Sequence, residues 1–92
     1  QRQMCIRDSG SPEANFNMGL LKAEQNDLTG AEKHMRTALK TDPNFSEAAY
    51  NLAILISNEN LDESLTLCRK AYELRPRDPI YAYTLAFYLR QQ

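Results

Sequence analysis

The sequence SEAAYNLAILISNENLDESLTLCRKAYELRP, at residues 46–76, decides the fold. It reads as two amphipathic helices joined by a short polar turn. The residues before it repeat the same text: ANFNMG at 14–19 aligns with AAYNLA at 48–53, an offset of 34, and ALKTDP at 38–43 aligns with AYELRP at 71–76, an offset of 33. A repeat of this length indicates a stack of helix pairs rather than a single closed globule.

The two offsets differ by one, so one residue is missing from the second copy. We place the loss in the turn around residues 57–60, because loops tolerate deletions better than helices do. The apolar periodicity and the turn residues together predict five helices, at about 12–25, 28–40, 45–58, 61–74 and from 79 onwards.

Helix starts carry their usual signals. Ser11 and Pro12 suit the N-cap and the first helical position of the first helix. Asn44 and Glu47 have the spacing of a capping box for the third helix. The segment YAYTLAFYL at 81–89 has the aromatic content of a strand. The repeat phase and the Asp-Pro start at 78–79 nevertheless predict a helix.

Small residues recur at fixed places in the repeat: Gly19, Ala53 and Ala86 in the first helices, and Ala38 and Ala71 in the second. Small side chains let neighbouring helices approach closely, and a larger group would overpack the contact. We predict that these positions are buried.

The same residues resemble the tetratricopeptide repeat, a helix-turn-helix unit with a 34-residue period and a W-x2-L-G-x2-Y…A-x3-F…P pattern. The chain has no Trp, and Lys22 stands at the first Tyr position. The positions that match the pattern are Met18-Gly19, Ala31, Met35 and Pro43, then Leu52-Ala53, Ser64, Cys68 and Pro76, and in a third copy Leu85-Ala86.

The resemblance implies an all-α fold, a right-handed superhelical solenoid of antiparallel helix pairs. It would hold about two and a half repeats in five helices, within a domain at 11–92. We expect repeats at 12–45 and 46–78 and a partial repeat at 79–92. Residues 1–10 fall outside the repeat phase and are predicted to be a non-native or disordered tail. Residues 4–9 can be encoded by a sequence resembling a transposon end used in preparing sequencing libraries.

Composition and motifs argue against several classes of function. Eleven basic and twelve acidic residues nearly cancel, so the chain lacks the concentrated positive charge that nucleic acid or an anionic membrane demands. Cys5 and Cys68 have no metal-ligand spacing. His34 has charged and polar neighbours and is interpreted as a surface residue. We therefore predict no enzymatic activity, no cofactor and no metal site.

In proteins that this chain resembles, the first helices of successive repeats line a concave groove that binds peptides. The resemblance places an aromatic row at Phe16, Tyr50 and Tyr83, an apolar row at Leu20, Ile54 and Phe87, and ligand-binding amides at Asn17 and Asn51. Further matching positions are Glu13, Glu24, Glu47, Asn58, Thr84 and Arg90.

The resemblance thus implies a non-catalytic protein-interaction module that binds a partner peptide or helix in this groove. Members that bind chaperone tails use Lys and Asn where this chain has Phe16 and Leu20, so a carboxylate clamp is not expected. An alternative is a structural or regulatory segment of a larger repeat array, or of a multidomain enzyme, with no ligand of its own. The C-terminal helix, which no further predicted helix follows, would also allow self-association.

Overall fold

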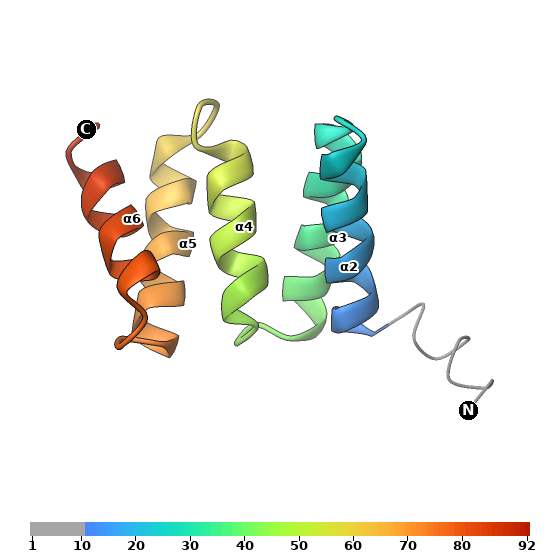
Figure 1. The fold of residues 1–92 in the computed structure, drawn as a ribbon, viewed down its shortest axis with the longest axis horizontal. Helices are drawn as coiled ribbons and strands as arrows, with labels where there is room; N and C mark the ends of the chain where they lie inside the picture. Colours follow the sequence, from blue (N-terminus) through green and yellow to red (C-terminus); the bar gives the residue numbers. More distant parts are fainter. Residues whose placement is uncertain (1–10) are drawn as a thin grey trace.

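The computed structural model describes residues 11–92, which form five α-helices and no strand. Successive helices run antiparallel and follow one another along the long axis of the molecule. They alternate between two layers, with α2, α4 and α6 in the nearer layer of Figure 1 and α3 and α5 behind them. The all-α fold of antiparallel helix pairs is confirmed, while the right-handed sense of the superhelix stays a prediction. The predicted tail at 1–10, with Cys5, lies outside the described residues. The helices are α2 (Pro12–Glu24), α3 (Leu28–Thr41), α4 (Ser46–Ile56), α5 (Leu61–Leu74) and α6 (Pro79–Leu89).

Polar side chains start four of the five helices. Ser11 Oγ accepts a hydrogen bond from the backbone N–H of Ala14 at 3.0 Å, and Asp78 Oδ1 accepts one from Ile80 at 3.0 Å. Asp27 and Asn60 cap α3 and α5 in the same way. Each cap satisfies a backbone donor that the first turn leaves without an intrahelical partner.

The predicted capping box at the start of α4 is wrong. Phe45 is the N-cap residue and makes no side-chain cap hydrogen bond. The backbone N–H of Asn44 instead donates to Asp42 Oδ1 at 3.1 Å, so Asn44 belongs to the preceding turn. The ring of Phe45 packs on Phe16 of α2 with centroids 5.0 Å apart, which fixes the entry of α4 by an apolar contact.

The residue missing from the second copy shortens a helix rather than the turn. α2 has 13 residues and α4 has 11, and the turn that follows α4 is the longer of the two. The deletion therefore moves the end of α4 towards its N-terminus, which leaves residues 57–60 to close the gap to α5.

The core lies between the two layers and is centred on α4. Met35 of α3 packs with Leu52 and Ile56 on one side of α4. Ala53 packs with Leu65, Cys68 and Leu85 on the other side and so joins α4, α5 and α6. The Ser64 hydroxyl of α5 donates to the backbone carbonyl of Ala53 at 2.8 Å, which satisfies a buried polar group across this contact.

The small-residue positions are buried as predicted, with one exception. Gly19, Ala38, Ala53 and Ala71 are buried, and a Cβ on Gly19 would lie only 3.0 Å from Met35 Cε. Ala86, the equivalent residue of α6, is exposed, so that prediction is wrong. Ala53 is buried because α5 packs against it, whereas no helix of the described residues packs against the corresponding side of α6.

Candidate functional site

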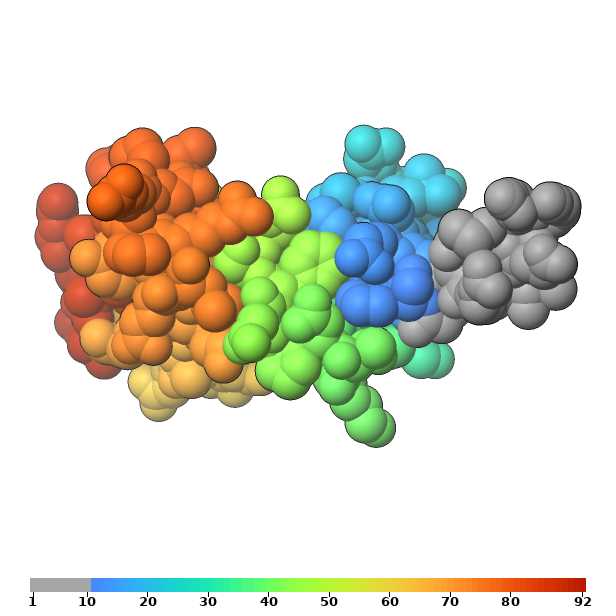
Figure 2. Space-filling model, turned by 90° about the horizontal axis from the view of Figure 1, so that it is seen from below, coloured from blue at the N-terminus to red at the C-terminus, as the bar shows by residue number. Residues whose placement is uncertain are grey.

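The predicted site residues lie on one face of the layer formed by α2, α4 and α6. Within each helix they are spaced by three and four, which places their side chains on one side of the helix. In Figure 2 the upper outline, formed by this layer, is hollowed between the orange start of α6 and the blue-to-cyan α2, with yellow-green atoms of α4 between them. We call this side the first-helix face and define it by Glu13, Phe16, Asn17, Leu20 and Glu24 of α2 and the residues at the equivalent positions of α4 and α6.

The apolar row of the first-helix face is open to solvent. Leu20 is 36% exposed, Ile54 42% and Phe87 46%. One such residue stands on each of the three helices, so the row crosses the layer. Exposed apolar side chains mark an interaction surface when they form a contiguous patch.

The aromatic row is not uniform. The ring of Tyr50 packs on Tyr81 of α6 with centroids 4.8 Å apart, and its hydroxyl lies 3.1 Å from Thr84 Oγ1, in hydrogen-bond contact. Phe16 is likewise half-buried, against Phe45. Tyr83 is 69% exposed. Phe16 and Tyr50 therefore pack against neighbouring parts of the chain, and only Tyr83 leaves most of its surface accessible to a partner.

The two amides also differ. Asn51 Nδ2 donates to the backbone carbonyl of Glu47 at 2.8 Å, so this amide is half-buried and partly used within α4. Asn17 is exposed, and its side-chain amide has no hydrogen-bond partner within the described residues. Its amide can both donate and accept.

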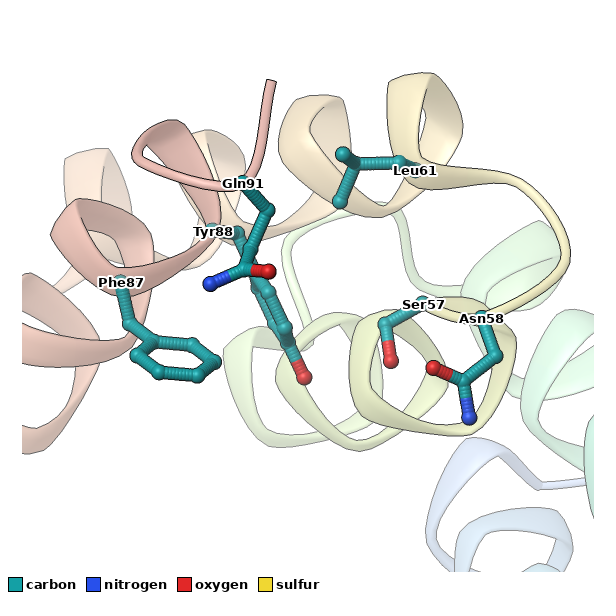
Figure 3. A pocket seen from close by; sticks show the side chains of 6 residues that line it. All are labelled: Ser57, Asn58, Leu61, Phe87, Tyr88 and Gln91. Carbon is teal, nitrogen blue, oxygen red and sulfur yellow. The ribbon is translucent and has the colours of Figure 1, made fainter.

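A pocket of about 430 Å³ opens at one end of the first-helix face, where the end of α4, the start of α5 and the end of α6 meet (Figure 3). Gln91 and Tyr88 extend into it from the α6 side, and Ser57 and Asn58 lie across from them after α4. The wall is completed by Phe87 and Leu61. All six side chains are uncharged, so the pocket offers hydroxyl and amide groups together with an aromatic ring and an apolar wall.

Sequence reasoning missed most of this pocket. It included Asn58 and Phe87, but it placed Arg90 rather than Gln91 at the end of α6. The repeat offset of 33 that relates Ile54 to Phe87 also relates Asn58 to Gln91, so the signal was present for that residue. Tyr88 and Leu61 carried no such signal, because their role depends on where α4 ends.

His34 and Cys68 both have a structural explanation within the described residues. His34 Nδ1 lies 3.2 Å from Asn15 Oδ1, which ties α3 to α2. Burial raises the pKa of the Cys68 thiol to about 11, so the thiol stays protonated at neutral pH and packs as an apolar group. Among residues 11–92 no three His, Cys, Asp or Glu side chains are grouped as a metal site would require. Within the same range no helix is long and apolar enough to cross a membrane.

Comparison with known proteins agrees with this architecture. Residues 12–45 match the model of the tetratricopeptide repeat family. The comparison with curated proteins found no match to the chain. Tetratricopeptide repeats are typical of protein–protein interaction modules and are generally not enzymes. The chain therefore carries a tetratricopeptide repeat within an all-α stack of antiparallel helix pairs.

Proposed function

We propose that the chain is a non-catalytic protein-interaction module whose first-helix face docks a partner peptide or helix. The observation that carries this proposal is the exposed apolar row Leu20, Ile54 and Phe87, which crosses three neighbouring helices. Its residues repeat at equivalent positions, so a linear segment lying across the helices would meet the same kind of side chain at each step.

The pocket in Figure 3 supports the same proposal. Phe87 belongs both to the apolar row and to the pocket wall. A segment on the row can therefore place a side chain in the pocket without leaving the face. Ligand pockets combine apolar lining with a few polar groups that fix orientation, and Asn58, Tyr88 and Gln91 supply such groups here.

The test is selection of binding peptides from a displayed library of random sequences. Peptides of about 12 residues, at ~3.3 Å per residue, reach roughly 40 Å, which is comparable to the 46 Å long axis of the fold. We expect selected peptides to bind the chain and to lose at least about tenfold in affinity on Ile54→Ala or Phe87→Ala, as residues central to an interface do.

The matched control is Leu28→Ala, which removes a comparably exposed leucine from α3, away from the face. Circular dichroism would verify that all three variants remain folded. Binding that survives Ile54→Ala and Phe87→Ala but is lost with Leu28→Ala would place the partner surface elsewhere and contradict the proposal.

A second candidate function, a structural segment with no ligand of its own, draws support from Tyr50. Because Tyr50 contacts Tyr81 and Thr84 of α6, part of the aromatic row holds the helices together. This alternative predicts that Tyr50→Ala lowers the melting temperature, that Tyr83→Ala leaves it unchanged, and that the library yields no peptide whose binding depends on Tyr83. Loss of peptide binding in a fully folded Tyr83→Ala variant would contradict it.

A further inference from the structure

Charge is unevenly divided between the two layers of the fold. Within α2, α4 and α6 the acidic residues are Glu13, Glu24 and Glu47, and the basic one is Lys22. α3 and α5 carry five basic and four acidic residues, so they are nearly neutral, and the excess of acidic over basic residues belongs to the layer of α2, α4 and α6.

All three glutamates lie on the first-helix face. Glu13 and Glu24 flank Leu20 at helical spacings of seven and four, and Glu47 precedes Ile54 by seven, so acid and apolar side chains share one side of each helix. Lys22 is two residues from Leu20 and so points to the opposite side of α2. All three glutamates are exposed. The face is therefore acidic over α2 and α4. α6 itself carries no charged side chain, and the exposed Arg90, three residues after Phe87, adds one positive charge just past its end.

None of these carboxylates makes an ion pair within the described residues. The ion pairs found there join Arg36 to Glu32 and to Glu63, both in the other layer. The first-turn positions of Glu13 and Glu47 also have a local explanation, since negative charge is favourable at a helix N-terminus. Glu24 is the last residue of α2, where the helix dipole disfavours an acid. Helix stability therefore does not account for Glu24.

We propose that the partner segment is cationic and amphipathic, with Lys or Arg residues beside bulky apolar ones. This inference rests on the proposed function and specifies the partner class of the same face. The basic residues would lie over α2 and α4, near Glu24 and Glu47. The apolar residues would lie over α6, where Tyr83 and Phe87 are exposed. An acidic segment is disfavoured by like charge on the same surface.

The charge contribution is modest for each pair, because exposed ion pairs are screened by salt with a Debye length of about 10 Å at 0.1 M. We expect two carboxylates together to change the affinity for a basic peptide by about threefold to tenfold at low salt, with the difference shrinking as salt is added.

The experiment repeats the library selection with a double variant, Glu24→Gln/Glu47→Gln. Its matched control is Asp62→Asn/Glu73→Gln, which also removes one exposed first-turn acid and one exposed last-turn acid, but from α5 in the other layer. The net-charge change and the effect on helix dipoles are thus the same in both variants.

Peptides selected on the unchanged chain should be enriched in Lys or Arg next to aromatic or aliphatic residues. Their affinity, measured by fluorescence anisotropy, should fall about threefold or more with Glu24→Gln/Glu47→Gln and stay unchanged with the control. Selected peptides without basic enrichment, or an equal loss in both variants, would overturn the inference. Either result would leave the proposed function standing as long as Ile54→Ala still weakens binding about tenfold or more. Peptides insensitive to both Ile54→Ala and Phe87→Ala would contradict the proposed function and this inference together.

Discussion

Asn26 shows how a single residue directs the chain between two helices. Its φ of 63° is left-handed, the only positive value outside glycine in the described residues. The backbone N–H of Asp27 donates to the carbonyl of Lys22 at 2.8 Å, and that of Asn26 donates to Ala23 at 3.0 Å. This pair of bonds is a Schellman motif, which satisfies carbonyls at the end of α2 and turns the chain towards α3.

The first prediction concerns this residue. Asn26→Ala places a Cβ-bearing residue without a compensating polar side chain in the left-handed region, at a cost of about 1 kcal/mol in unfolding free energy. Asn26→Gly should be neutral or slightly stabilising. Urea denaturation of both variants gives the comparison, and an alanine variant as stable as the glycine variant would mean that the turn is not held in this conformation.

The second prediction concerns Ala53. Ala53→Leu inserts a large side chain where α4, α5 and α6 meet, beside the carbonyl that accepts the Ser64 hydrogen bond. We expect a loss of roughly 1–3 kcal/mol in unfolding free energy, a large share of the stability of so small a domain. The same substitution at the equivalent exposed residue, Ala86→Leu, should change stability by less than about 0.5 kcal/mol. Thermal melts of the two variants provide the measurement, and similar melting temperatures would contradict the helix packing described above.

Among the elements, α3 and α5 are linked directly by one side chain. The Arg36 guanidinium donates to both carboxylate oxygens of Glu63, at 2.7 and 3.0 Å, and also to Glu32 on its own helix at 2.9 Å. The hydrogen bonds from Arg36 lower the pKa of the Glu63 carboxyl below its ordinary 4.5. A carboxyl whose pKa is lower in the folded state stabilises that state above its unfolded pKa, and the contribution is lost as pH falls through the folded pKa.

The third prediction follows from this dependence of stability on pH. Both side chains are partly exposed, so Arg36→Gln should reduce the unfolding free energy by about 1 kcal/mol or less at neutral pH. The difference from the unchanged chain should shrink as pH falls below the ordinary range of a glutamate carboxyl, because protonation of Glu63 removes the ion pair. Arg69→Gln is the matched control, because Arg69 holds the equivalent place in α5 and makes no ion pair within the described residues. A stability difference that persists unchanged at low pH would show that Arg36 acts through packing rather than charge.

At the scale of the whole molecule, stability is expected to decline from the middle of the row towards its ends. α4 packs against α3 on one side and α5 on the other. Among its described neighbours, α6 packs on α5 and on Tyr50 of α4. α2 buries only Gly19. In a stack of repeats each unit is stabilised by its neighbours, so helices with fewer neighbours open more often.

The fourth prediction follows from this arrangement. Backbone amides of α4 and α5 should exchange with solvent roughly tenfold or more slowly than those of α2 and α6, as measured by hydrogen exchange. Tyr50→Ala, which removes the ring contact with Tyr81, should speed exchange in α6 more than in α2. Equal exchange rates in all four helices would mean that the described residues open as one cooperative unit.

The sequence by itself determined the elements and their order. The helix starts at Pro12, Leu28, Leu61 and Pro79 agree with prediction, because cap residues and apolar periodicity are local properties. It also identified the residues that face one side of α2, α4 and α6, since the repeat offset assigns equivalent positions without reference to the rest of the fold.

Only the tertiary structure decided which of these equivalent residues are open. Phe16, Tyr50 and Tyr83 share one repeat position, yet the first two are half-buried by Phe45 and Tyr81 while Tyr83 is exposed. Exposure depends on the neighbouring helix and not on the residue's own helix. The pocket has the same origin. It joins residues from 57 to 91, and it exists because α4 ends at Ile56 while α6 continues beside the gap, a relation between helices that periodicity within one helix does not encode.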